Sequence, residues 1–175
     1  MPFLGTTDQD KNIKGFSLVE ILIVIVIFSI LLTMAGSMFR AYENNRYLKE
    51  AAAALMSDIK LAKQRSVSEY VERVDNVDYP VVYRITIDQD NNSYTVQGYY
   101  IKDGVNNYKY NVTKNLSDFK GGVSIIDQNY SANTVNIQTR GTSSAGTIVL
   151  QNARGSSIKI ITSPMGRVRS EETLK

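Results

Sequence analysis

The 175-residue chain contains no cysteine, no histidine and no tryptophan. Without cysteine it can form neither a disulfide framework nor a thiol nucleophile. Without histidine, the Ser-His-Asp arrangement and most zinc sites are excluded as well. Serine is plentiful, but the sequence shows no base that would activate it. We therefore expect a protein that is not an enzyme, with no catalytic residues and no cofactor.

The chain also has little net charge and, in one place, no charge at all. Its 20 basic and 17 acidic residues leave a formal charge of +3, so any interpretation as a nucleic-acid binder must rest on local clustering. Residues 21–39 contain no charged side chain, whereas the rest of the chain is polar and rich in Tyr, Asn, Ser and Thr. The hydrophobicity is thus concentrated near the N-terminus.

This uncharged stretch has the length of a membrane span. As a helix, residues 21–39 measure about 28 Å, close to the hydrocarbon thickness of a bilayer. Lipid favours a helix because every backbone group must be hydrogen-bonded within the segment. Lys11 and Lys14 precede the stretch and only Arg40 directly follows it, which places the N-terminus in the cytoplasm. We expect a single-pass protein of the inner (cytoplasmic) membrane with the remainder exported; a buried core helix is the alternative and is usually shorter.

One acidic residue, Glu20, stands at the start of this apolar stretch. A carboxylate there is costly unless it finds a partner, which makes it a functional candidate. The alternative is a side chain at headgroup level, favoured by the helix dipole. Residues 14–20, Lys-Gly-Phe-Ser-Leu-Val-Glu, resemble the cleavage motif of type IV prepilins and type II secretion pseudopilins. An ordinary secretory signal would instead be cut near the small residues at 35–37.

The resemblance implies a processing pathway. A membrane-bound prepilin peptidase would cut between Gly15 and Phe16, remove residues 1–15 as a leader, and methylate the new amine of Phe16. Glu20 would then be the fifth residue of the mature chain, and its carboxylate would pair with the Phe16 amine of its own or a neighbouring subunit. An unpaired charge in an apolar bundle is strongly penalised, so the pair would set the register of assembly. The leader is longer than many, and the later part of the hydrophobic helix lacks a proline.

Beyond the apolar stretch, the spacing of hydrophobic residues predicts a continuing helix. An apolar stripe recurs every three or four positions, at Leu48, Ala52, Leu55, Ile59 and Ala62. The charged residues off that stripe are Lys49, Glu50, Asp58, Lys60 and Lys63. We predict one helix from about Phe16 to about Ser68, made of a transmembrane part (16–39) and an amphipathic part (40–68) packed on the head. Residues 55–66 also resemble, more weakly, the corresponding helix of the GspH/FimT branch of minor pseudopilins.

The remainder, residues 69–175, is predicted to form a β-rich exported head. Alternating patterns predict strands at 81–87, 93–97, 123–126, 134–138, 147–151, 157–162 and 167–169. Residues 69–79 have the composition of a mixed-charge linker ending at Pro80, and residues 98–118 that of a surface loop. The predicted fold class is α+β, with a long N-terminal helix packed on a small antiparallel β-sheet, as in pilins.

Two groups of residues in the head have ligand-like spacing. Asp88, Asp90 and Asn92 match the first three ligand positions of a calcium loop, but Ser93 and Tyr99 stand where Gly and Glu are needed. A hairpin turn is therefore expected there, and no metal site.

The second group is the C-terminal string Gly-Arg-Val-Arg. In a strand, Arg167 and Arg169 would share one face about 7 Å apart, and the arginine fork suits phosphate. The string resembles the C-terminal motif by which FimT-like minor pilins contact DNA during uptake; Arg154, Lys159 and Arg140 are candidates to extend it. Glu171 and Glu172 argue instead for a solvated last strand.

These observations predict a minor pilin or pseudopilin. It would be a non-enzymatic structural subunit of a type IV pilus or a type II secretion pseudopilus, joined to other pilins through its N-terminal helix. The alternative within this class is a FimT-like DNA-binding minor pilin. A remote alternative is a signal-anchored periplasmic enzyme or receptor, which the missing catalytic residues disfavour.

Overall fold

A computed structural model describes residues 16–175, except for the side chains at positions 34, 35, 37 and 38. The expected leader, residues 1–15, lies outside the described residues, and so does Gly15. The chain divides into two units, Met1–Phe39 and Arg40–Lys175, each of which is treated by itself below. One helix, α1 (Leu18–Ser68), runs through both. The predicted single helix is thus confirmed, with its first residue two positions later than expected.

The N-terminal unit consists of the first part of α1. Every described side chain from Phe16 to Thr33 is exposed, including the large apolar ones. Within the described part of the chain, no helix combines the length and the hydropathy that a membrane crossing requires.

The second unit holds the rest of α1 and two four-stranded antiparallel sheets. The first sheet has the order β5-β4-β3-β7 and the second the order β10-β9-β8-β6. The strands of the first sheet are β3 (Val82–Asp88), β4 (Ser93–Lys102), β5 (Val105–Asn115) and β7 (Thr134–Ile137). Those of the second are β6 (Ser124–Gln128), β8 (Gly146–Gln151), β9 (Ser157–Thr162) and β10 (Val168–Thr173). Two short 3-10 helices are η1 (Leu116–Asp118) and η2 (Ser131–Asn133). The predicted α+β class is confirmed.

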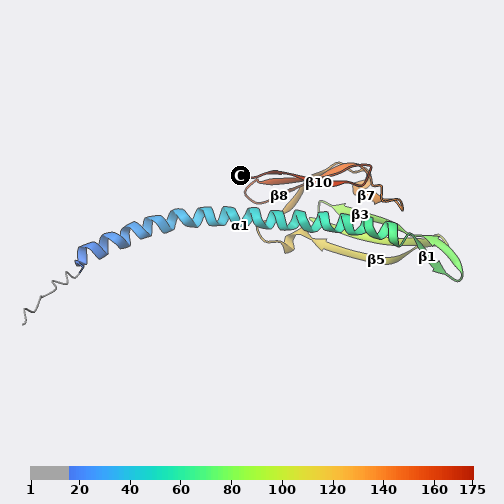
Figure 1. Cartoon of the computed structure of the whole chain (residues 1–175), viewed down its shortest axis with the longest axis horizontal. Coiled ribbons are helices and arrows are strands. Elements are labelled where there is room, and N and C mark those ends of the chain that lie inside the picture. The colour runs from blue at the N-terminus through green and yellow to red at the C-terminus, as the bar shows by residue number, and fades with distance from the viewer. Residues whose placement is uncertain (1–15) are drawn as a thin grey trace, which may run out of the picture. The chain divides into compact units, whose positions relative to one another are not determined.

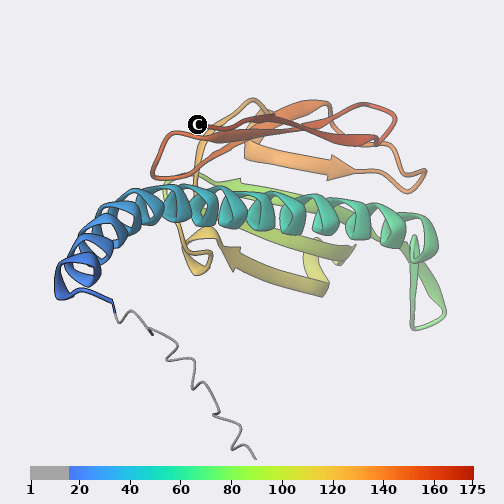
Figure 2. The ribbon, with the colours of Figure 1, turned by 60° about the vertical axis from the view of Figure 1, so that its left-hand side comes forward.

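The core of this unit lies between α1 and both sheets, which flank the helix in the two views of Figures 1 and 2. The predicted apolar stripe is confirmed, because all five of its residues are buried. Leu48 and Leu55 are fully buried and join the same cluster as Ile85 of β3 and Ile160 of β9. The helix therefore closes the core that the sheets alone would leave open.

Two segments differ from the sequence prediction. The supposed linker forms a hairpin of β1 (Val71–Val74) and β2 (Val77–Pro80), and the supposed loop 98–118 forms the end of β4 and all of β5. Both turns are two residues long with positive φ: Asp75 and Asn76 in one, Asp103 and Gly104 in the other. Such pairs fit the tight turns that match the twist of a hairpin. The prediction of a surface loop at 98–118 was wrong because β5 is an edge strand whose polar side chains face solvent.

Candidate functional site

The N-terminal end of α1 is held by a reciprocal pair of hydrogen bonds. Ser17 Oγ accepts from the backbone N–H of Val19 at 3.4 Å, and the Glu20 carboxylate accepts from the backbone N–H of Ser17 at 3.0 Å. This is a capping box, in which a serine and a glutamate three residues later satisfy N–H groups that a helix start leaves free. The sequence signal was the Ser-x-x-Glu spacing. Phe16, directly before the cap, is 85% exposed.

The helix beyond this cap presents apolar side chains in every direction. Leu22, Phe28, Ile30 and Leu31 are each more than half exposed, and at 3.6 residues per turn they lie on different faces of α1. The hydroxyls in this segment are satisfied internally: Ser29 bonds the carbonyl of Ile25 at 2.8 Å and Thr33 that of Ile30 at 2.7 Å. A helix that is hydrophobic all round needs an apolar environment to cover it, because a soluble protein does not leave so large a surface in water.

Residues 10–36 match the model of the prokaryotic N-terminal methylation motif. The matched range contains Gly15, Phe16, Glu20 and most of the uncharged stretch. It ends before the head. No curated protein and no solved structure matches the chain. The motif is that of type IV prepilin-like proteins, and it supports a pilin-like or pseudopilin-like structural subunit. It indicates processing by a prepilin peptidase, interaction with other pilins, and anchoring in the inner membrane with an exported head.

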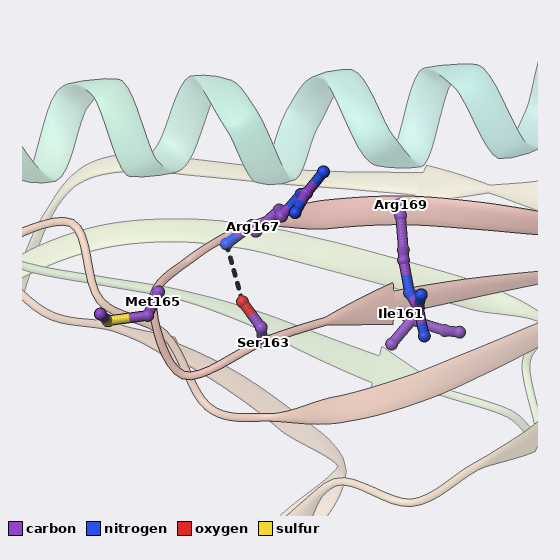
Figure 3. Close-up of a pocket in the computed structure, with 5 residues that line it drawn as sticks. All are labelled: Ile161, Ser163, Met165, Arg167 and Arg169. Carbon is purple, nitrogen blue, oxygen red and sulfur yellow. Dashed lines mark hydrogen bonds between the residues drawn. The ribbon is translucent and has the colours of Figure 1, made fainter.

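The C-terminal arginines lie at a turn and the strand that follows it. Arg169 belongs to β10, whereas Arg167 lies in the turn before it, its backbone N–H bonded to Ser163 Oγ at 3.2 Å. Both line one open hollow together with Ile161, Ser163 and Met165 (Figure 3). The Arg169 guanidinium lies 3.4 Å from the carboxylate of Glu171. The structure therefore brings the two arginines to one hollow, with an acidic neighbour beside the second.

Arg167 also lines a second hollow, on the side of α1. Its side chain extends toward the helix in Figure 3, and the residues around this hollow include Lys60 and Lys63 of α1. We call this hollow the basic groove: Lys60, Lys63, Gln64, Val67, Ser68, Gly166, Arg167 and Val168. From sequence, the two lysines are placed only off the apolar stripe of α1, because nothing local shows that the C-terminal turn returns to them.

The remaining predicted basic residues are spread over the second sheet. Arg154 lies in the turn between β8 and β9, at the opposite end of β9 from the turn that holds Arg167. Lys159 lies in β9 directly across from Glu171 of β10. Arg140 precedes Gly141, whose backbone packs against Gly166. Of these three residues, the fold brings Arg140 near Arg167 and leaves Arg154 at the far end.

A polar cluster inside the head was missed from sequence. The sequence places Asp58 off the apolar stripe of α1, yet its side chain is only 9% exposed. Its carboxylate accepts from the hydroxyl of Tyr94 at 2.7 Å and from Lys114 Nζ at 2.8 and 3.0 Å. Burial, followed by the hydrogen bond to Asp58, raises the pKa of the Tyr94 hydroxyl. The cluster joins α1 to β4 and β5, and thereby fixes the helix on the first sheet.

A second tyrosine fastens the C-terminal end of α1. The hydroxyl of Tyr83, a residue of β3 that is 1% exposed, donates to the Glu69 carboxylate at 3.0 Å. Burial and then this hydrogen bond raise the pKa of Tyr83 to about 12. Lys109 of β5 lies 2.6 Å from Glu72, in the hairpin that follows the helix. These contacts tie the end of α1 to the first sheet.

The segment from Asp88 to Asn92 forms the hairpin turn that the sequence predicts, between β3 and β4. The Asp88 carboxylate accepts from the backbone and side-chain N–H groups of Asn91 at 3.0 and 2.7 Å, which lowers its pKa. The side-chain amide of Asn92 donates a hydrogen bond to the carbonyl of Val123 and accepts one from the backbone N–H of Ile125. Two of the three candidate ligands are therefore engaged in holding the turn.

Proposed function

We propose that this chain is a minor pilin or pseudopilin, a subunit of a type IV pilus or a type II secretion pseudopilus that assembles through its N-terminal helix. The observation that carries the proposal is the uncovered apolar surface of α1, most of which lies within the range that matches the methylation motif. Lateral contact with like helices would cover that surface and leave the head outside. The weak resemblance of residues 55–66 to the GspH/FimT helix favours a minor subunit of this kind.

Before assembly, the same helix would hold the protein in the inner membrane. The nineteen residues 21–39 carry no charge in the full sequence, including the four positions whose side chains the structure does not describe. Lys11 and Lys14 would keep the N-terminus cytoplasmic and Arg40 would mark the exported side. The peptidase would then reach the Gly15–Phe16 bond from the cytoplasm.

The experiment compares two variants. One places a charge on the apolar surface of α1, and the other places a charge on the head. The full chain is expressed in a cell with a prepilin peptidase and a filament assembly system, and sheared filaments are probed for the subunit. Phe28→Lys should remove the subunit from filaments, because a lysine in an apolar bundle is costly. Val82→Lys, on the exposed side of β3, is the matched control and should incorporate normally. Equal incorporation of both variants would contradict assembly through this helix.

A second candidate function is DNA capture by a FimT-like subunit. The specific observation is that Arg167 and Arg169 line one hollow at the entrance to β10. Phosphate contacts from two arginines would give weak binding without sequence preference, with a dissociation constant of roughly 10⁻⁴ to 10⁻⁶ M. Lys159 and Arg154 lie farther along the same sheet and would add contacts only to a duplex that follows it.

A salt titration of duplex binding by the residue 40–175 fragment tests this candidate; the whole buried core lies within that fragment. Log affinity should fall with log salt at about −0.9 per phosphate contact, and Arg167→Ala with Arg169→Ala should reduce that slope by about two. Lys49→Ala is the control, since the charge of Lys49 is already paired with Glu172. No binding, or equal binding by the double variant, would exclude the arginines as a DNA site.

A further inference from the structure

The basic groove gathers cations that have no acidic partner. Elsewhere in the head, Lys109, Lys114 and Arg73 each lie within 3.0 Å of a carboxylate. Among the described residues, neither Lys60 nor Arg167 takes part in an ion pair, and Lys63 Nζ donates only to the carbonyl of Gly166 at 3.2 Å. No carboxylate lines the groove. Three like charges held together in this way repel one another unless an anion joins them.

The walls of the groove are fixed by close packing. Gly166 is buried with φ +70°, and any side chain on it would collide with the carbonyl of Gly141. Gly141 in turn lies against Lys63 and Val67 of α1. The C-terminal turn therefore packs closely on the helix, and the backbone positions that carry Lys63 and Arg167 are held side by side.

The same head carries an unmatched acidic surface. Asp90 lies at the tip of the β3–β4 turn, and Asp88 begins that turn. Gln89, between them, donates to the carbonyl of Ile126 at 3.0 Å, which brings the turn beside Asp127 of β6. Within the described residues, none of the three aspartates takes part in an ion pair. We call them the acidic turn: Asp88, Asp90 and Asp127.

The two charged surfaces lie at opposite ends of the head. A hydrogen bond from the side chain of Asn92 to the carbonyl of Val123 joins the acidic turn to the segment before β6. In that segment Gly121 packs against Asn44 and Tyr47, so the acidic turn lies near this part of α1. The basic groove lies at Lys63 of the same helix. Nineteen helical residues separate positions 44 and 63, or about 28 Å along the axis. Lys120 and Arg154 also lie toward the first end, in the segments after η1 and β8, outside the acidic turn itself.

We infer that the basic groove receives the acidic turn of a second copy of this chain. Complementary patches at opposite ends of one molecule form a head-to-tail contact, and such contacts build rings where the rotation closes and open helical filaments where it does not. Charge complementarity of this kind sets the register and speeds association. The inference goes beyond the proposed function, because it assigns a contact between heads that does not involve the apolar first part of α1, residues 18–39.

Cysteine cross-linking can test this contact cleanly, since the natural chain has no cysteine. Two tagged full-length copies are co-expressed, one with Gln64→Cys in the groove and one with Asn91→Cys in the turn, and are then oxidised in the membrane. Both positions are exposed and uncharged, so the charges stay in place. The control pair is Gln64→Cys with Asn111→Cys, since Asn111 lies on the outer face of β5. The first pair should give at least about fivefold more mixed dimer than the control pair.

Charge reversal then identifies the partner. Lys60→Glu with Arg167→Glu in the first copy should reduce the dimer about fivefold, and Asp90→Lys with Asp127→Lys in the second copy should restore it. Arg169→Glu should have no effect, which separates this contact from the DNA candidate. Equal cross-linking in the control pair, or no response to charge reversal, would overturn the inference. A loss that the swapped copy does not restore would assign the groove to a different acidic partner and overturn it too.

Discussion

The backbone N–H of Ser17 donates to the carboxylate of Glu20 at 3.0 Å, and both residues belong to the same chain. Glu20 therefore has a local role at the helix start that does not depend on assembly. The role implied by the family resemblance is a different one, since it needs the negative charge to attract the amine of Phe16. A glutamine can cap a helix in the same way but carries no charge.

Glu20→Gln and Glu20→Ala should separate these two roles. Both variants should insert into the membrane at the wild-type level and incorporate poorly into filaments, because both lose the charge. The alanine variant should also lose the hydrogen bond between the Glu20 carboxylate and the Ser17 N–H, and the helix should fray more at Ser17. Hydrogen exchange at the helix start and filament yield measure the two effects. Normal incorporation of Glu20→Gln would show that the carboxylate serves only as a cap.

Asp58→Ala should destabilise the head more than Lys114→Ala does. The variant leaves the buried hydroxyl of Tyr94 without an acceptor, which costs about 1–3 kcal/mol. Lys114→Ala should cost less than about 1 kcal/mol, since the side chain of Lys114 is 40% exposed and Asp58 keeps its bond to Tyr94. Denaturant unfolding of the residue 40–175 fragment gives both values. The reverse order would mean that the lysine, and not the tyrosine, anchors Asp58.

The head should lose stability in alkaline solution as Tyr83 ionises. Its pKa is raised from about 10 to about 12, so the folded state holds this proton more tightly than the unfolded state. The resulting stabilisation is complete below pH 10 and is lost as the pH rises from 10 to 12. At about 1.4 kcal/mol per pKa unit, the loss is at most about 2.7 kcal/mol.

Unfolding free energies at pH 9 and pH 12 measure this loss. Tyr83→Phe should show a smaller loss than wild type over that interval, with Tyr94 still contributing because its pKa is raised as well. Tyr108→Phe is the control, because the ring of Tyr108 is 46% exposed. An identical pH dependence in wild type and Tyr83→Phe would remove Tyr83 as a cause.

The helix was predictable because its periodicity is local. Leu48, Leu55 and Ile59 repeat at helical spacing, and their burial requires nothing more than a sheet to cover them. The burial of Asp58 was not predictable in this way, because it depends on Tyr94 and Lys114, which lie in strands 36 and 56 residues away. A local pattern cannot show that a charged residue will meet partners so distant in the chain.

The hairpins had a local signal that the polar composition concealed. Asp103 and Gly104 form the pair typical of a two-residue hairpin turn, yet the Asn- and Tyr-rich sequence around them lacks the β-branched residues of a usual strand. The basic groove had no such signal. Lys63 meets Gly166 across 103 residues of chain, and only the fold brings them together.

The central claim, that this chain is processed as a prepilin, is tested most directly at its N-terminus. The full chain is co-expressed with a prepilin peptidase and the product is analysed by intact and N-terminal mass spectrometry. We expect a chain that begins at Phe16 with a methylated amine and lacks residues 1–15, and Gly15→Val should block the cut. An intact N-terminus, or a cut near residues 35–37 as in an ordinary secretory signal, would contradict the account.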